Sequence, residues 1–277
     1  LTYTIKSDGT YASNGTTAGG SSLSGSTLTA GYLSSSNDND RTVVVTVTDD
    51  GGNNYKTSSV DVTITVQKYT RTLTWTDATP TSVTYGDTSK SATVTLSGTG
   101  GTAGAVSYSS GTTTVLTIAS STGKITPVAA GSSEVTASLA RTTTVKAASV
   151  KKTISITRAT GNITLSANKS VQYGTTSTTF TVSSHHGGAL TVSDPSGTPT
   201  ASINGTTVTI SNIGAVTAGS TVSVTVTSGQ TDQYNAASAT YTLTITEADN
   251  TITGESATIK TRATKDISTL VSNVKGT

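Results

Sequence analysis

Apolar residues alternate with threonine or serine over many short segments of this chain, and this alternation restricts the fold more than any other feature. Apolar residues occupy every second position of 43–48, and the same spacing recurs at 62–66, 222–226 and 241–245. Successive side chains of a β-strand point to opposite faces, so such a segment places one face against a core and the other in water. Threonine suits the wet face because its branched Cβ is stiff and fits the pleat.

Turn residues separate these segments, as at 50–53, 98–101 and 187–188. Many short strands divided by turn signals are typical of an all-β sandwich. A chain rich in threonine and serine could also be a disordered, mucin-like stalk. Such stalks are rich in proline, whereas this chain has 4 prolines, and its alternation is regular. No segment keeps a 3.6-residue period, so we expect almost no helix.

Composition excludes several classes of protein. The net charge is +2 with 12% charged residues, which is too balanced for the clustered basic face of a nucleic-acid-binding protein. No apolar run approaches the 18 or so residues of a membrane span. The absence of cysteine rules out disulfides, thiolate metal sites and cysteine nucleophiles. A length of 277 residues allows one large domain or two to three smaller ones.

The chain contains an internal repeat of about 90 residues. A short segment leading into a strand occurs at 55–59, 145–149 and 234–238, and a second landmark, Tyr85-Gly86, returns as Tyr173-Gly174. This period is the size of an immunoglobulin-like sandwich of about seven strands. The sequence therefore predicts tandem all-β, immunoglobulin-like domains, with complete units at 67–156 and 157–246.

The two ends of the chain look like the two parts of one further unit. The segment 1–66 begins in mid-unit, because residues 1–4 match 190–193 and its first strands are missing. The segment 247–277 matches the start of a unit, since 246–253 resembles 157–164. We therefore predict a partial domain at 1–66 and, at 247–277, the first strands of a further domain that would complete the 1–66 domain of the next copy.

A half sandwich would leave open sheet edges and an uncovered apolar face. Either the 277 residues are one period of a longer chain, or separate subunits join head to tail by strand addition. Both arrangements give an open, heterologous contact that builds a fibre. An arbitrary boundary within a longer chain is a third reading. We expect tail strands at 251–253 and 257–260, and interface residues at Thr251, Ile252, Thr253, Ile259, Val271, Val274, Leu1 and Tyr3.

Two groups of residues carry a family resemblance. The segment 121–137, a strand followed by an Ala-Ala-Gly turn and another strand, resembles the signature of group 2 bacterial immunoglobulin-like domains of the intimin and invasin type. The segments 73–87 and 232–237 resemble threonine-rich repeats of large bacterial surface proteins. The resemblance implies a tandem immunoglobulin-like fold and an extracellular or cell-surface location. It implies no catalytic residues, and relatives include adhesin stalks, virion proteins and domains attached to secreted enzymes.

Acidic clusters are the first candidate metal site. Asp38 and Asp40 form one cluster, and Asp49 and Asp50 form the other. Oxygen-rich loops can hold Ca²⁺, but the strand between the clusters would separate them by roughly 26 Å. We therefore interpret both as turn residues, keep either as a minor Ca²⁺ candidate next to a neighbouring domain, and expect no cofactor.

The remaining candidate residues have structural explanations. His185 and His186 precede a Gly-Gly pair, and we interpret them as a solvated turn in preference to a metal site. Trp75 aligns with Leu165 at an inward strand position, so we expect it in the core. No nucleophile elbow, phosphate loop, zinc motif or paired carboxylates is present, so we expect no enzymatic activity.

These observations predict a structural repeat of an extracellular bacterial fibre, filament or adhesin stalk, whose partner is another copy of itself. The prediction includes no nucleic acid partner and no membrane span in this segment. One alternative is an adhesin module that binds a carbohydrate or receptor through the loops 20–27 and 98–104. Another is an immunoglobulin-like domain of a phage virion or tail fibre.

Overall fold

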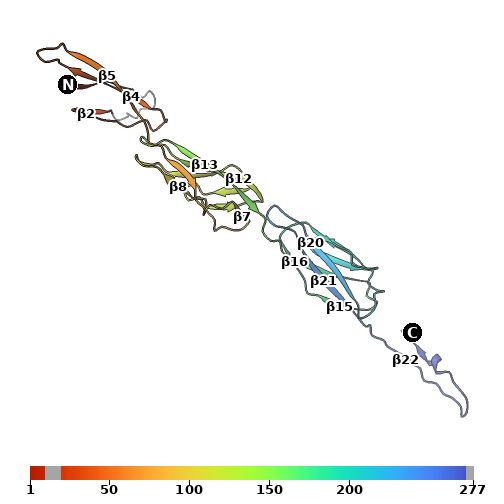
Figure 1. Cartoon of the computed structure of the whole chain (residues 1–277). Coiled ribbons are helices and arrows are strands. Elements are labelled where there is room, and N and C mark those ends of the chain that lie inside the picture. The colour runs from red at the N-terminus through yellow and green to blue at the C-terminus, as the bar shows by residue number, and fades with distance from the viewer. Residues whose placement is uncertain (10–19, 273–277) are drawn as a thin grey trace. The chain divides into compact units, whose positions relative to one another are not determined.

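The computed structural model describes residues 1–9 and 20–272, and its contacts divide the chain into two compact units, 1–159 and 160–277. Among the described residues the regular structure is β-strand, apart from one 3₁₀ turn, η1 (Ile267–Leu270) (Figure 1). The predicted all-β fold with almost no helix is thus confirmed. No helix in the described part is long and apolar enough to cross a membrane.

The described residues of the first unit, 1–9 and 20–159, form thirteen strands in five sheets. Its first 66 residues, which we call the head segment, hold the sheet β1-β4-β5 and the hairpin β2-β3. Residues 67–159 hold the sheet β7-β13-β12-β9 and the pairs β6-β8 and β10-β11. The bounds are β1 (Thr2–Asp8), β2 (Ser22–Ser24), β3 (Thr27–Thr29), β4 (Arg41–Asp49), β5 (Ser58–Val66), β6 (Thr72–Trp75), β7 (Ser82–Thr84), β8 (Val94–Ser97), β9 (Val106–Ser110), β10 (Leu116–Ile118), β11 (Ile125–Pro127), β12 (Gly131–Leu139) and β13 (Ala148–Thr157).

The second unit contains a complete two-sheet sandwich followed by a short hairpin. One sheet has the order β14-β16-β19-β18 and the other β15-β21-β20-β17, and the hairpin is β22-β23. The bounds are β14 (Ile163–Leu165), β15 (Lys169–Gln172), β16 (Ser177–His185), β17 (Leu190–Val192), β18 (Thr200–Asn204), β19 (Thr207–Ser211), β20 (Thr221–Ser228), β21 (Ala237–Thr246), β22 (Thr253–Gly254) and β23 (Val271–Ser272).

The predicted alternation forms the core of the sandwich at 160–246. The alternate apolar residues at 222–226 of β20 and at 241–245 of β21 are all buried, together with two residues of the facing strand β16. Phe180 stacks on Tyr241 with ring centroids 3.8 Å apart, and burial raises the pKa of the Tyr241 hydroxyl. Each fully buried Val, Leu, Ile or Phe contributes roughly 1.5–3 kcal/mol, so this face holds the two sheets together.

The sandwich at 67–159 buries two apolar clusters between its sheets. Trp75 packs against both clusters, and its ring centroid lies 6.3 Å from that of Tyr108. The prediction that Trp75 belongs to the core is therefore confirmed. Because Trp75 is the only tryptophan, its fluorescence reports on this sandwich alone.

The central hairpin of each repeat keeps the same register. Val45 pairs with Val62, Val135 with Lys152, and Val224 with Tyr241. In the two sandwiches the second strand of this hairpin also has a parallel neighbour: β7 lies beside β13, and β15 lies beside β21. In the head segment, the equivalent strand β5 pairs with β4 alone among the described strands.

The substitution Ile154→Ala tests the core of the sandwich at 67–159. Ile154 is fully buried, and removing its side chain leaves a cavity that should lower the free energy of unfolding by about 2–5 kcal/mol. Denaturant unfolding followed by Trp75 fluorescence measures the change. Thr153→Ala, on the exposed face of the same strand, should change stability by less than about 0.5 kcal/mol. Equal effects of the two variants would contradict this assignment of faces.

Candidate strand-acceptor groove

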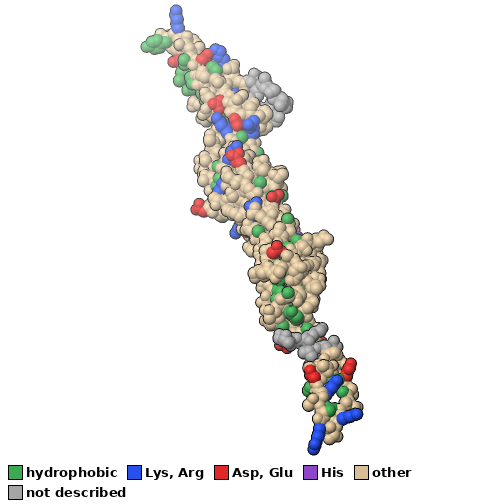
Figure 2. Space-filling model, turned by 90° about the vertical axis from the view of Figure 1, so that its right-hand side faces the viewer, with side chains coloured by type: hydrophobic (Ala, Val, Ile, Leu, Met, Phe, Trp, Pro, Cys, Tyr) green, Lys and Arg blue, Asp and Glu red, His purple; other side chains and the backbone are tan. Residues whose placement is uncertain are grey.

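The head segment has an apolar groove between its sheet and its hairpin. The groove has a volume of about 180 Å³ and opens to solvent (Figure 2 shows exposed hydrophobic side chains over the head segment). Strands β1, β4 and β5 supply one wall and β2-β3 the other. The lining residues are Tyr3, Leu23, Ser26, Leu28, Val45, Val47, Val62 and Ile64.

The complete sandwich at 160–246 shows what covers the equivalent groove. Its hairpin pairs Ile203 with Val208, as the head hairpin pairs Leu23 with Leu28, and both hairpins turn at a glycine with positive φ. In the complete sandwich, β16 lies beside β19 and buries its apolar residues against the facing sheet. No described strand occupies that position beside β3 in the head segment.

A second edge is open along β5. Val60 is 61% exposed and Val62 is 42% exposed, whereas Tyr241, which occupies the position of Val62 on the equivalent strand β21, is fully buried. The alternation at 62–66 correctly predicted a strand. Its inward face is only partly covered, because no strand among the described residues of the head segment covers it.

The tail hairpin repeats part of the pairing that the head segment lacks. Thr253 pairs with Ser272 between β22 and β23, and Thr164 pairs with Ser184 between β14 and β16. By the sequence alignment Thr253 corresponds to Thr164, so the antiparallel pairs β22–β23 and β14–β16 both include this position. The described tail, 247–272, therefore contains the start of a β14–β16 pair.

The predicted interface residues of the tail are exposed. Ile252 is 59% exposed, Ile259 51% and Val271 40%, and Thr251 and Thr253 are also exposed. The segment 257–260 forms no strand in the single chain, because a strand needs a neighbour to receive its backbone hydrogen bonds. Val274 lies outside the described residues.

The predicted interface residues of the head lie at and beside the groove. Tyr3 is half-buried and lines the groove, and it pairs with Val47 across β1 and β4. Leu1 is 74% exposed and precedes β1. The structure thus places Tyr3 in the lining of the groove, whereas Leu1 is not among the lining residues.

The backbone conformation of Arg262, which the sequence did not indicate, gives a closer alignment of the tail with the two sandwiches. Arg262 has φ +63°, and Gly86 and Gly174 have φ +86° and +87° at the turn that follows β7 and β15. Arginine rarely adopts this conformation, so sequence comparison does not match it to a glycine. Ile259 lies three residues before Arg262, as Val83 lies before Gly86 and Val171 before Gly174, so these three residues occupy the same position. Between Ile252 and Ile259 the tail is one residue shorter than the matching segment of the sandwich at 160–246.

Charged residues on both faces of the head sheet are paired. Arg41 is nearly buried, with its guanidinium 3.2 Å from Asp8 and 2.9 Å from the Ser21 hydroxyl. Asp61 accepts hydrogen bonds from Lys6 and Thr46, and these lower the pKa of its carboxyl.

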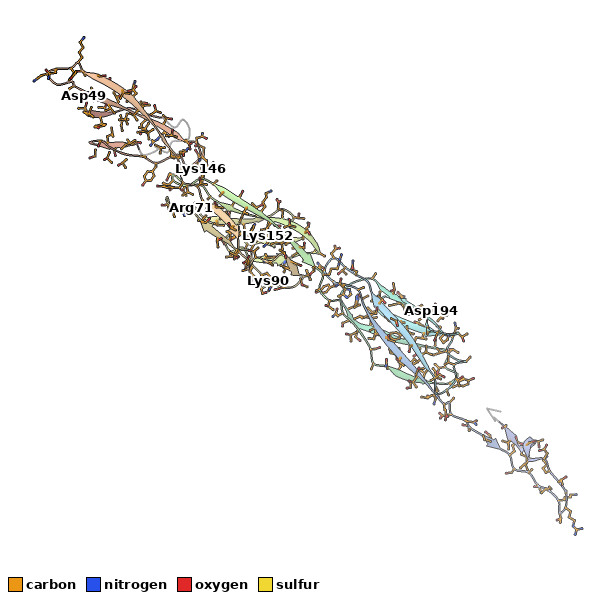
Figure 3. The ribbon with its side chains drawn as sticks, viewed as in Figure 1. Asp49, Arg71, Lys90, Lys146, Lys152 and Asp194 are labelled. Carbon is orange, nitrogen blue, oxygen red and sulfur yellow. The ribbon has the colours of Figure 1, made fainter. Side chains whose placement is uncertain are left out.

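Asp38 and Asp40 form ion pairs that join the head segment to the sandwich at 67–159. The Asp38 carboxylate lies 3.3 Å from the Lys68 ammonium and 3.5 Å from the Arg141 guanidinium. Asp40 lies 3.6 Å from Lys146, which Figure 3 labels between the two parts of this unit. Three cationic side chains thus surround the carboxylates of Asp38 and Asp40. A Ca²⁺ ion would instead need further oxygen ligands around these carboxylates.

Asp49 and Asp50 stabilise a turn at the opposite end of the head segment, as the label of Asp49 in Figure 3 shows. Their carboxylates accept hydrogen bonds from the backbone of Gly51 and Gly52 at 3.1 and 3.2 Å. This is the turn chemistry expected from the sequence. Within the described residues there is no group of three or more His, Asp, Glu or Cys side chains that could hold a metal ion.

His186 has a structural role that the sequence analysis missed. The prediction of a solvated turn is wrong for this residue, because the ring is partly buried and bridges three segments. Its Nε2 lies 2.8 Å from the Gly229 carbonyl oxygen, its Nδ1 accepts from the Asn162 amide at 3.1 Å, and the ring packs on Tyr234. The local sequence around His186 does not indicate these partners, because they lie in distant segments of the chain.

Both loops considered for ligand binding take part in the structure of the first unit. The segment 20–27 contains β2 and the turn of the hairpin that lines the groove. In the segment 98–104, the Arg71 guanidinium donates to the carbonyl oxygens of Gly100 and Gly101 at 2.7 and 3.2 Å.

No protein-family model matches this chain. No curated protein matches it either, so the group 2 relationship stays a resemblance. Among solved structures, the chain is similar to domains 4 and 5 of the S-layer protein SbsC, with 19% identity, a TM-score of 0.26, and coverage of 65% of this chain and 99% of that chain. It spans 33% and 34% of two longer structures of the same protein.

Two further similar structures contain repeated domains. Drosophila N-cadherin EC1-4 has 12% identity, a TM-score of 0.32, and coverage of 90% of this chain and 66% of that chain. Titin domains z1z2, in complex with telethonin, have 13% identity, a TM-score of 0.34, and coverage of 64% and 98%. At these identities the likeness concerns the fold alone, which the sheets and cores described above establish independently.

The substitution Asp38→Asn tests the ion pairs at the base of the head segment. It leaves the buried Lys68 ammonium without its carboxylate, which should weaken this contact by about 1–3 kcal/mol. The Leu33 amide donates to the Thr143 carbonyl oxygen across the same junction at 3.1 Å. We expect faster hydrogen exchange at the Leu33 amide, measured by NMR.

Asp49→Asn is the matched control, because Asp49 lies in the turn at the other end of the head segment. It should leave exchange at Leu33 unchanged. Unchanged exchange in Asp38→Asn would show that the ion pairs do not hold the junction.

Proposed function

We propose that this chain is a structural repeat of an extracellular fibre, and that the tail of one copy completes the head segment of the next. The observation that carries the proposal is the open groove of the head segment, together with the tail hairpin that repeats the β14–β16 register. The tail supplies the strands that correspond to β14, β15 and β16. The head supplies those that correspond to β17 through β21.

Two physical terms favour this completion. The incoming strands would bury the apolar groove residues, and each fully buried valine or leucine contributes roughly 1.5–3 kcal/mol. They would also pair with the open edges of β3 and β5, which removes exposed backbone donors and acceptors. The apolar groove residues and the two open strand edges belong to the same head segment, so a single tail can both cover the groove and pair with the edges.

The contact is heterologous, because the donor and acceptor surfaces are different parts of the chain. A heterologous contact that does not close into a ring propagates as a fibre. The same contact serves separate subunits that exchange strands and successive repeats of one longer chain. Load would pass through sheet hydrogen bonds and buried side chains, which suits a stalk or filament at a cell surface.

The role we propose is mechanical and requires no catalytic group. The described polar clusters are engaged in ion pairs, turns and junctions: Asp38 with Lys68, Asp49 with Gly51, and His186 with Gly229. The threonine-rich strands and the resemblance to bacterial surface repeats support an extracellular location.

Blocking the groove and deleting the tail test the proposal from its two sides. We expect the full chain to form species larger than a monomer in sedimentation, in a concentration-dependent way. Val62→Lys places a charge in the apolar groove and should prevent the chain from accepting a tail. A chain ending at residue 246 should be unable to donate one. Mixed together, these two variants should form a one-to-one dimer and nothing larger.

Thr63→Lys is the matched control, since Thr63 lies next to Val62 on the exposed outer face of β5. It should assemble like the parent chain. Trp75 fluorescence shows whether the sandwich at 67–159 stays folded in each variant. Assembly of Val62→Lys at the parent level, or a mixture that remains monomeric, would contradict the proposal.

A further inference from the structure

A second pocket lies at the junction between the head segment and the sandwich at 67–159. Its volume is about 210 Å³. The head segment contributes Leu33 and Val66 to its lining, and the part that follows contributes Gln67, Tyr69, Thr143 and Thr144. The pocket is therefore lined by both parts of the first unit, at the end of the open β5 edge.

The complete sandwich at 160–246 shows which residue fills the equivalent space. Leu33 corresponds to Ile213 by the matched hairpins, and Val66 corresponds to Ile245 by the matched register of β5 and β21. Ile213 and Ile245 belong to one buried cluster, and Val171 packs against it. Val171 also pairs with Ile245 between the parallel strands β15 and β21.

We propose that Ile259 of an incoming tail fills this junction pocket and sets the register of docking. This inference rests on the proposed function and specifies its partner segment. Ile259 matches Val171 and Val83 through the positive φ of Arg262, Gly174 and Gly86. Val83 pairs with Ile156 and is buried, as Val171 pairs with Ile245. Ile259 of one copy is accordingly placed beside Val66 of the next.

A backbone hydrogen bond follows from the same register. The Tyr85 amide donates to the Thr157 carbonyl oxygen, and the Tyr173 amide donates to that of Thr246, each at 2.8 Å. Thr157 and Thr246 both correspond to Gln67. The amide of Thr261 from the tail therefore donates to the carbonyl oxygen of Gln67, immediately before the chain turns at Arg262.

Docking of a tail at this pocket makes the contact between the head segment and the sandwich at 67–159 depend on assembly. Because Tyr69, Thr143 and Thr144 form the far side of the pocket, a side chain placed in it contacts both the head segment and the following sandwich. The Leu33 amide, which donates to Thr143 across the junction, would become more protected when a tail is bound. Assembly thus stiffens the junction in addition to completing the head.

Engineered disulfides test the register, since the chain has no native cysteine. In the double variant Val66→Cys/Ile259→Cys, the two Cα atoms would be parallel neighbours about 4.8 Å apart, within disulfide range. Oxidation should join copies into a ladder on a non-reducing gel. In the control, Val62→Cys/Ile259→Cys, four residues separate the positions by about 13 Å, and no ladder should form.

The outcomes separate the register from the proposed function. A ladder from the first pair alone supports the inference. Assembly in sedimentation together with a ladder from the control pair, or from neither pair, overturns the inference and leaves the proposed function standing. A chain that stays monomeric in sedimentation overturns the proposed function, and the inference falls with it.

The substitution Ile259→Asp tests the pocket without cross-linking. A carboxylate in the pocket is costly to desolvate, so association in sedimentation should weaken about tenfold or more, and the Leu33 amide should lose its assembly-dependent protection. Thr258→Asp introduces the same charge one residue earlier, on the opposite face of the incoming strand, and should assemble like the parent chain. Equal effects of the two variants would overturn the role of Ile259.

Discussion

A β-sandwich requires that both of its sheets have their strands and that the apolar face between them is covered. In the sandwich at 160–246, β16 meets this requirement by lying between β14 and β19, with Phe180 and Val182 buried against the facing sheet. The head segment has the facing sheet and the β2-β3 hairpin without a described strand in that place. Among the described strands, β5 likewise lacks the parallel neighbour that β15 gives to β21. The open groove, the exposed β5 edge and the proposed role of the tail follow from these two differences.

The junction below the head segment depends on charge as well as on packing. Asp38 and Asp40 form ion pairs with Lys68, Arg141 and Lys146. Cationic side chains of residues 67–159 therefore contact acidic side chains of the head segment. The junction pocket lies in the same region, where Val66 ends the head segment and Gln67 follows it. A tail docked there would reach residues of both parts, which is why completion of the head and stiffness of the junction become one property in our proposal.

Local pattern explains which predictions succeeded. The alternation at 222–226 and 241–245 predicted strands and their inward faces, and the structure buries those faces. The inward position of Trp75 followed from its alignment with Leu165. The partners of His186 and Asp38 come from segments distant in the sequence, so no local pattern predicts them. The left-handed turn at Arg262 was also hidden, because the residue type usually found there is glycine.

The sequence by itself determined the strands of the repeats and the period of about 90 residues, because alternation and repetition can be read from the order of the residues alone. Only the tertiary structure decided which faces are covered, since burial depends on whether a second sheet is present. Val62 and Tyr241 occupy equivalent positions in strands of the same pattern and pairing, yet Val62 is exposed and Tyr241 is fully buried. An alternating strand specifies the side that prefers a core; the strands around it determine whether that core exists.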